Sequence, residues 1–293
     1  MSSAAALYGP ALLQSGALHA QTLKLPLAIQ LYSVRNQLPT DFAGTLKTLA
    51  GLGYREVEAA GYYNNSAADV KKALDDAGLK LISAHYTSDD LNKQFDQIMA
   101  FNNALGVSTI ICSMPAYKDP WRLAALAPRD RNNAYTIDDW RWNADQFNQF
   151  GDKVHAAGMK FGYHNHTMEF KEIDGVSPYT ELLRLTDPAK VTIEMDCGWV
   201  IVGGGDPIDL LTKYPTRISM LHVKDFKRPD PAAQRRGGIA ELGQGYIDYR
   251  PIFAAAAKTG HITHCFVEQE GFDMPPMDSL KIDADYMRGL GIS

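Results

Sequence analysis

Ionisable side chains stand near the ends of six short apolar runs, and most of them come in pairs spaced two residues apart. They are Glu56 and Glu58, His85, His164 and His166, Glu194 and Asp196, His222 and Lys224, and Glu268 and Glu270. Such groups are costly to bury without partners. Two imidazoles and two carboxylates that converge on one point are good ligands for a divalent cation, and the mixture favours Mn²⁺, Co²⁺ or Zn²⁺ over Mg²⁺. The residue types therefore predict one bound metal ion.

The elements that must position these side chains follow a repeating order. From Leu25 onward, a short apolar run alternates eight times with an amphipathic segment. The predicted strands cover 27–33, 54–60, 79–85, 107–114, 160–166, 191–197, 218–225 and 264–270. Strict alternation implies a parallel sheet with right-handed crossovers, and eight units close into a (β/α)₈ TIM barrel. An open doubly wound sheet is the alternative, but no GxGxxG motif follows the first strand to support it.

The carboxyl ends of barrel strands form the active site, so the paired residues are expected at one mouth of the barrel. Ser66 is expected to cap the second helix, which ends at Gly78. Residues 115–135 are too long for an ordinary connection and are expected to form a loop at the working end of the fold.

Composition narrows the classes of partner. The chain has 293 residues, is 45% hydrophobic and 22% charged, and carries a net charge of -5. An acidic balance gives no general attraction to a phosphate backbone, which disfavours nucleic-acid binding. No run of about 18 apolar residues exists to span a membrane. A small-molecule partner is therefore expected.

The first twenty residues differ from the rest, because they are rich in Ala, Leu and Ser and carry no formal charge. They are expected to be either a truncated export signal or a disordered extension, with residues 21–293 forming a single catalytic barrel domain. An export signal would place the protein in the periplasm or outside the cell, and without one a cytoplasmic location is expected.

Several segments resemble the sugar phosphate isomerase/epimerase family of the xylose-isomerase-like TIM barrel superfamily. They are AIQLYSVR (28–35), GYREVEAAGYY (53–63), LISAHY (81–86), GYHNHTMEF (162–170), EMDCGWV (194–200), LHVKDF (221–226) and FVEQEG (266–271). The resemblance extends over 25–291 and implies one metal ion held by strands five to eight. It implies Asp196, His222 and Glu268 as three ligands. The family commonly has Glu where this chain has His164. We expect His164 to be the fourth ligand, with Glu169 from the following turn as the alternative.

The resemblance implies carbohydrate chemistry through an enediolate. A divalent ion chelated by a carbonyl and an adjacent hydroxyl acidifies the neighbouring C–H, and a carboxylate removes the proton. Glu268 is the expected base, and a second acid is expected among His166, Glu169, Lys224 and His85. The main prediction is a sugar or keto-sugar isomerase or epimerase. The alternative is a lyase or dehydratase that acts on a 3-keto-sugar or glycoside by β-elimination, and the absence of the strand-five carboxylate weakens the case for simple 3-epimerisation.

Substrate contacts are expected from polar groups and from aromatic walls, which suit the C–H faces of sugar rings. The expected residues are His85, Glu58, Tyr32 and Trp199. Two further classes stay open. A non-enzymatic sugar-binding barrel would not need the ionisable cluster, and a nuclease like endonuclease IV would need a three-zinc site with more histidines. Barrels of this kind commonly form dimers or tetramers, so a homo-oligomer is open as well.

Overall fold

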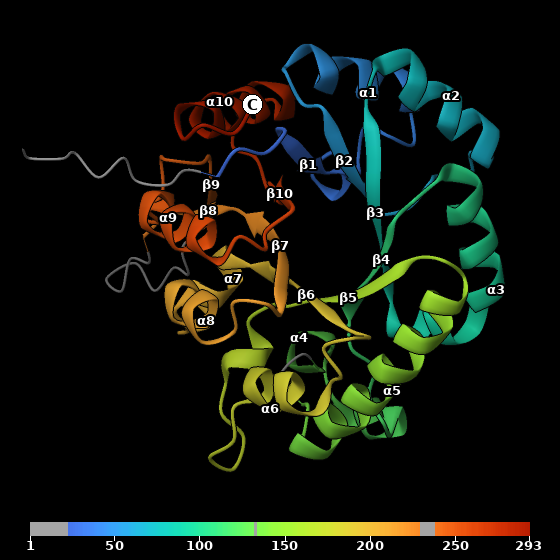
Figure 1. The fold of residues 1–293 in the computed structure, drawn as a ribbon, viewed down its shortest axis with the longest axis vertical. Coiled ribbons are helices and arrows are strands. Elements are labelled where there is room, and N and C mark those ends of the chain that lie inside the picture. Colours follow the sequence, from blue (N-terminus) through green and yellow to red (C-terminus); the bar gives the residue numbers. More distant parts are fainter. Residues whose placement is uncertain (1–22, 132–133, 229–237) are drawn as a thin grey trace, which may run out of the picture.

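A closed barrel of eight parallel strands forms the centre of the molecule, in the order β1-β10-β7-β6-β5-β4-β3-β2 (Figure 1). The computed structural model describes residues 23–131, 134–228 and 238–293. The barrel strands are β1 (Ala28–Gln30), β2 (Glu56–Ala59), β3 (Lys80–Thr87), β4 (Thr109–Met114), β5 (Lys160–His164), β6 (Thr192–Asp196), β7 (Ile218–Val223) and β10 (His264–Val267). The predicted (β/α)₈ barrel is confirmed, and the open-sheet alternative is wrong.

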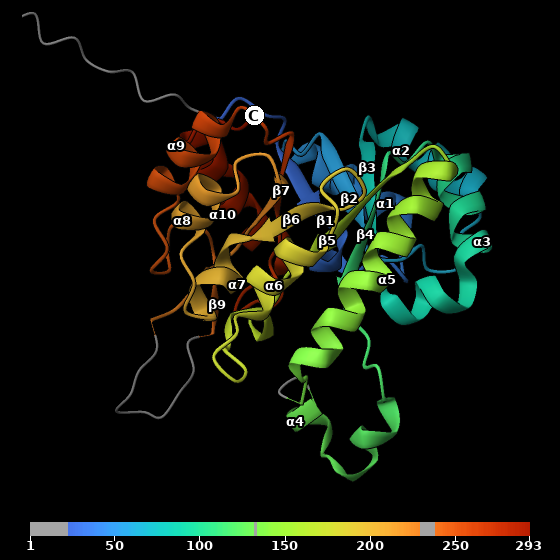
Figure 2. The ribbon, with the colours of Figure 1, turned by 60° about the horizontal axis from the view of Figure 1, so that its bottom comes forward.

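Helices cover the outside of the barrel (Figures 1 and 2). They are α1 (Phe42–Gly51), α2 (Ala67–Ala77), α3 (Ser88–Leu105), α5 (Ile137–Ala156), α6 (Pro178–Leu185), α8 (Pro207–Lys213), α9 (Tyr249–Thr259) and α10 (Pro276–Gly289). The Ser66 side chain accepts a hydrogen bond from the Asp69 backbone and caps α2, as expected. Gly78 ends the same helix with φ 67°, a left-handed conformation that glycine adopts without strain.

Alternation of side chains along the strands divides the interior into two environments. Outward-facing apolar residues pack against the helices in one large core, while a small cluster inside the barrel consists of Ala28, Ile82, Ile111, Met220 and Phe266. Met220 precedes His222 by two residues on the same face of β7. The apolar cluster therefore fills the amino-terminal side of the barrel and leaves the carboxyl-terminal side to polar groups.

Several short elements differ from the expected pattern. The first strand ends at Gln30 rather than Ser33, because a 3₁₀ helix, Leu31–Val34, follows it directly. A short helix, α7 (Cys197–Val202), begins where β6 ends. The expected loop after β4 contains a 3₁₀ helix, Pro120–Ala125, and α4 (Pro128–Arg131).

A two-stranded antiparallel hairpin of β8 (Asp225–Phe226) and β9 (Ile239–Ala240) follows β7. In Figure 2, β9 and α4 lie toward the same, lower end of the barrel. Both segments follow the carboxyl ends of barrel strands, so that end is the mouth.

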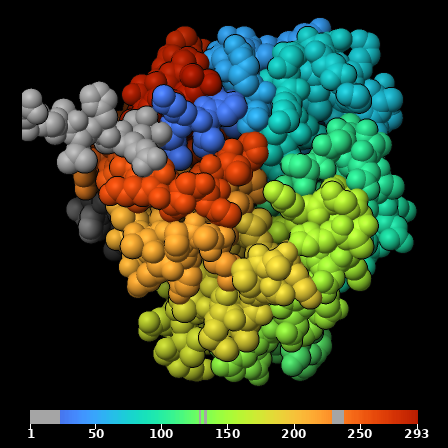
Figure 3. All heavy atoms as spheres, viewed as in Figure 1, coloured from blue at the N-terminus to red at the C-terminus, as the bar shows by residue number. Residues whose placement is uncertain are grey.

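The two ends of the described chain meet at the opposite end of the barrel. β1 pairs with β10, and the Ser293 backbone N–H donates to the Leu25 carbonyl at 3.0 Å. Figure 3 shows the first described residues, in blue, lying against the last ones, in red and orange. The expectation for residues 1–20 lies outside the described residues. Within the described ranges, no helix combines the length and apolarity needed to cross a bilayer.

Candidate metal centre

Four buried side chains converge at the carboxyl ends of neighbouring strands β5, β6, β7 and β10. His164, Asp196, His222 and Glu268 each offer one ligand atom, and these atoms all lie within 4.8 Å of one another. Asp196 pairs with His222 in the strand register, and Glu268 directly follows β10. These are the four residues expected as ligands. Two imidazoles and two carboxylates on one cavity form a donor set that fits Mn²⁺, Co²⁺ or Zn²⁺.

Burial and neighbouring charges shift the pKa values of the four side chains in different directions. Burial, together with the nearby His222, lowers the pKa of His164 well below its usual value, so this imidazole is neutral and has a lone pair to donate. Burial raises the pKa of Asp196 to about 6. Burial would also raise the pKa of Glu268, but Lys224 and His222 outweigh it and hold that pKa well below its usual range.

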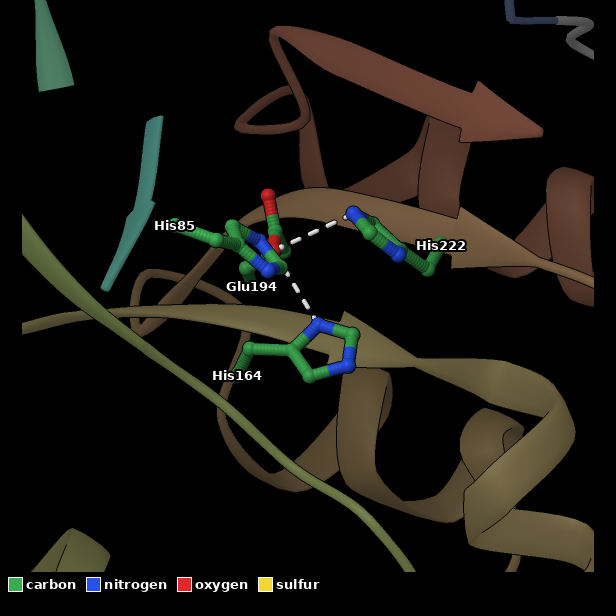
Figure 4. A group of neighbouring side chains, drawn as sticks. All are labelled: His85, His164, Glu194 and His222. Atoms are coloured by element: carbon green, nitrogen blue, oxygen red, sulfur yellow. Dashed lines mark hydrogen bonds and ion pairs between the residues drawn. The ribbon is translucent and has the colours of Figure 1, made fainter. Parts of the chain in front are cut away.

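A second group lies directly against the first and shares two of its histidines. His85, His164, Glu194 and His222 also place ligand-type atoms within 4.8 Å of one another (Figure 4). The Oε2 atom of Glu194 lies 2.7 Å from His85 Nε2, 3.1 Å from His164 Nδ1 and 3.2 Å from His222 Nε2. The sequence pattern marked Glu194 as a strand-end residue but gave it no role. The signal was its position two residues before Asp196, on the same face of β6.

Glu58 is fully buried behind this second group and does not line the cavity at the mouth. Its carboxylate accepts hydrogen bonds from Gln30 Nε2 at 2.8 Å and from Ser83 Oγ at 2.5 Å, and lies 2.7 Å from His222 Nε2. The expected contact between Glu58 and a substrate does not fit this position. Glu56 is further from the mouth, at the start of β2, where it pairs with His264.

A cavity of about 380 Å³ opens above the metal centre. Its lining residues are Tyr32, Ala60, His85, Tyr86, Thr87, Asp90, Ser113, Met114, His164, His166, Glu268 and Glu270. Tyr32, His85 and His166 therefore lie where substrate contacts or catalytic groups were expected. Tyr32 is at the rim, 40% exposed, with the Arg35 guanidinium carbon 4.2 Å from its ring centre.

Lys224 is fully buried among carboxylates. Its ammonium lies 2.9 Å from Asp196 and 2.8 Å from Glu268, and it also pairs with Glu270. Burial would lower the pKa of Lys224, but Asp196 and Glu268 outweigh it and raise the pKa, so the group stays positive. Its neighbour in the chain, Asp225, is not among these ion-pair partners. Asp225 instead accepts backbone hydrogen bonds from the 243–247 loop.

Trp199 supports the wall of the cavity without lining it. Its Nε1–H donates to Glu270 Oε1 at 3.2 Å, and the Lys224 ammonium lies 4.8 Å from the ring centre. Its ring centre lies 6.4 Å from that of His166, which does line the cavity, and contact between Trp199 and a substrate stays a prediction. The indole ring holds Glu270 beside Lys224.

His166 and Glu169 occupy the turn after β5 in different ways. His166 lines the cavity, and burial lowers its pKa to about 3, so the imidazole is neutral at pH 7. Glu169 is buried, accepts from Tyr163 Oη at 2.5 Å and from the His166 backbone N–H at 3.0 Å, and has a pKa raised to about 7 by burial. Glu169 belongs to neither group of converging ligand atoms in the described chain. Its contacts fix the turn that carries His166.

The chain is similar in sequence to one family of barrel proteins and to enzymes from several bacteria. The family model of the xylose isomerase-like TIM barrel matches residues 46–290. An inosose dehydratase of Lacticaseibacillus casei is 26% identical over 76% of this chain and 79% of its own length. An inosose dehydratase of Clostridium botulinum is 25% identical over 78% of this chain and 82% of its own length.

A crystal structure of a sugar phosphate isomerase/epimerase from Parabacteroides distasonis superposes with a TM-score of 0.73 and 28% identity. The superposition covers 90% of this chain and 98% of that one.

Proposed function

The chain belongs to the family of xylose isomerase-like TIM barrels, and from this premise we propose that it is a divalent-metal-dependent lyase that eliminates water or another β-substituent from a keto-sugar. The observation that carries the proposal is that His166, which lies outside the ligand set, lines the same cavity as His164 and Glu268 of the metal centre. The chain is similar to inosose dehydratases over more than three quarters of its length, which favours elimination over isomerisation as the proposed reaction.

His164, Asp196, His222 and Glu268 would hold the ion. When bound, the ion supplies Lewis-acid stabilisation of the ketone oxygen on which negative charge develops. We assign removal of the proton from the carbon beside the ketone to His166 rather than to Glu268, the base expected from the sequence. His166 is unprotonated at neutral pH, whereas Glu268 offers a ligand atom to the metal centre and pairs with Lys224. The resulting imidazolium then gives this proton to the departing hydroxyl, so that water leaves and a carbon–carbon double bond forms. Lys224 holds the carboxylates of Asp196 and Glu268 in place.

The cavity favours an uncharged sugar. It is lined by the acidic residues Asp90, Glu268 and Glu270, and no Lys or Arg side chain is among its described lining residues. A phosphate dianion would meet these carboxylates, and the nearest basic groups, His85 and Lys224, are already paired with carboxylates of the protein, which is electrostatically unfavourable. We therefore place the substrate among unphosphorylated keto-sugars and keto-inositols, the class to which inosose belongs.

An isomerase or epimerase is the second candidate, favoured by the 28% identity to the sugar phosphate isomerase/epimerase of P. distasonis. Epimerisation needs a base on each face of the reacting carbon. His164 stands where the family commonly supplies a carboxylate, which counts against it. A purely sugar-binding barrel is less consistent with fully buried ionisable groups, because their burial costs free energy that simple binding does not require.

One assay separates these activities. Metal-free protein is reconstituted with Mn²⁺, Co²⁺ or Zn²⁺ and incubated with inosose and with 3-keto-glycosides, while ¹H NMR and mass spectrometry follow the products. We expect loss of water or of the glycosidic substituent, dependent on the metal and abolished in Asp196→Asn. A product of unchanged mass with altered stereochemistry or carbonyl position would overturn the lyase and support the second candidate.

A further inference from the structure

We propose that Glu194 and Glu58 are positioning residues, which fix the nitrogen that each histidine of the metal centre turns toward the ion. This inference rests on the proposed metal centre. It also assigns the second histidine group, shown in Figure 4, to hydrogen bonding rather than to a second metal ion.

The His222 ring spans the space between two sets of carboxylates. Its Nδ1 lies 3.0 Å from Glu268 Oε2, on the side of the metal centre. Its Nε2 lies 2.7 Å from Glu58 Oε1 and 3.2 Å from Glu194 Oε2, on the opposite side. A neutral imidazole has one N–H and one lone pair. An ion bound at Nδ1 would replace any proton there, while Nε2–H would keep donating to Glu58 and Glu194.

His164 has the same relation to Glu194 with its nitrogens exchanged. Nδ1 lies 3.1 Å from Glu194 Oε2, and Nε2 lies 3.9 Å from Asp196 Oδ2. Donation from Nδ1–H to Glu194 leaves the lone pair at Nε2, beside Asp196. One carboxylate oxygen thus sets the tautomer of both histidines. Carboxylates in this position also raise the basicity of metal-bound imidazoles.

The positioning carboxylates are themselves held firmly. Both are fully buried. Glu58 is fixed by Gln30 on β1 and Ser83 on β3. His85 Nε2 lies 2.7 Å from Glu194 and 2.9 Å from Glu58, so its N–H bridges the two carboxylates. Side chains from two strands, β1 and β3, therefore hold the carboxylates that contact His164 and His222.

A second metal ion in this layer is disfavoured by the chemistry of the shared ligands. The second group would use His164 and His222 again. Each imidazole has two nitrogens, so binding an ion on both sides requires each ring to lose both of its protons. Two such rings would be needed at once. Hydrogen bonding to Glu194 requires no such deprotonation, and it uses the contacts that the structure contains.

Metal affinity measures the proposed role directly. Glu194→Gln preserves the shape of the side chain and removes the charge. We expect Co²⁺ and Zn²⁺ affinity to fall about 10- to 100-fold, as measured by chelator competition on the full-length protein. Glu58→Gln should weaken binding in the same direction. Glu172→Gln, which removes an exposed glutamate from the turn after β5, is the matched control and should bind as the wild type. Circular dichroism confirms that each variant is folded.

Two further readouts make the outcome unambiguous. At saturating Co²⁺ the visible absorption spectrum of Glu194→Gln should differ from that of the wild type, because the orientation of two ligands has changed. The wild type should bind one equivalent. Two equivalents in the wild type, with one lost in Glu194→Gln and the other bound as before, would overturn the inference, as would unchanged affinity and spectrum.

Failure of the proposed reaction would be distinguishable from these results. A wild type that binds one ion with the expected dependence on Glu194, yet eliminates nothing from keto-sugars, would contradict the lyase and leave the positioning role intact. A wild type that binds no ion would contradict the metal centre on which both depend.

Discussion

At the residue scale, the proposed reaction uses one set of side chains to bind the metal ion and another, His166, to transfer the proton. His166 lines the cavity but lies outside both groups of converging ligand atoms. We expect His166→Gln to lower kcat about 10²- to 10⁴-fold, the usual contribution of a general base, while metal content stays at the wild-type level. Steady-state kinetics with parallel metal analysis checks this. Loss of metal together with activity would show that His166 is a ligand instead.

Residue types and spacing predicted that ionisable side chains at the strand ends meet at one mouth of the barrel. The family resemblance then selected Asp196, His222 and Glu268 from this larger set as metal ligands, with His164 as the expected fourth. The role of Glu58 was not predictable in the same way. Whether an inward-facing carboxylate reaches the cavity or lies behind His222 depends on strand register and on its partners Gln30 and Ser83, and no local pattern encodes either.

At the element scale, a buried carboxyl group on α10 contacts the segment that follows β9. Asp283 on α10 accepts a hydrogen bond from the Leu242 backbone N–H at 2.7 Å, and burial raises its pKa to about 7. An aspartate in an unfolded chain titrates near pH 4. The folded state holds the Asp283 proton more tightly than the unfolded state does. The contribution of Asp283 to the free energy of unfolding should therefore fall as pH rises from about 4 to about 7.

Asp283→Asn should remove this dependence. Relative to the wild type, the variant should gain about 1–3 kcal/mol in free energy of unfolding at pH 8, where the wild type buries a charge, and less at pH 5. Denaturant unfolding at the two pH values measures the difference. An equal effect at both pH values would contradict the assigned pKa.

The long, regular elements were predictable, and the shortest ones were not. Helices such as α2 follow from Ser66, Gly78 and the spacing of apolar residues. The β8–β9 hairpin has two residues in each strand, which is too short for alternation to be visible. The 3₁₀ helix after Gln30 interrupts an apolar run that reads as a continuous strand, and it explains why the strand was expected to be longer.

At the scale of the whole molecule, the negative charge of the chain and of its cavity predicts a preference for substrates without a phosphate group. The chain has a net charge of -5, and the cavity is lined by carboxylates. A phosphorylated keto-sugar should therefore have a kcat/KM about 100-fold below that of its unphosphorylated counterpart. Raising the ionic strength should bring the two kcat/KM values closer together, since salt screens the repulsion between the phosphate group and the carboxylates. Equal kcat/KM values for the two substrates would contradict the substrate class proposed for this cavity.

The most direct test of the account is the metal content of the purified protein, measured by mass spectrometry beside the double variant Asp196→Asn/His222→Ala. We expect about one equivalent of Mn, Co or Zn in the wild type and almost none in the variant, which lacks two of the four ligands. A wild type that holds no metal and takes up none on reconstitution would contradict this expectation, and so would a variant that keeps its full equivalent.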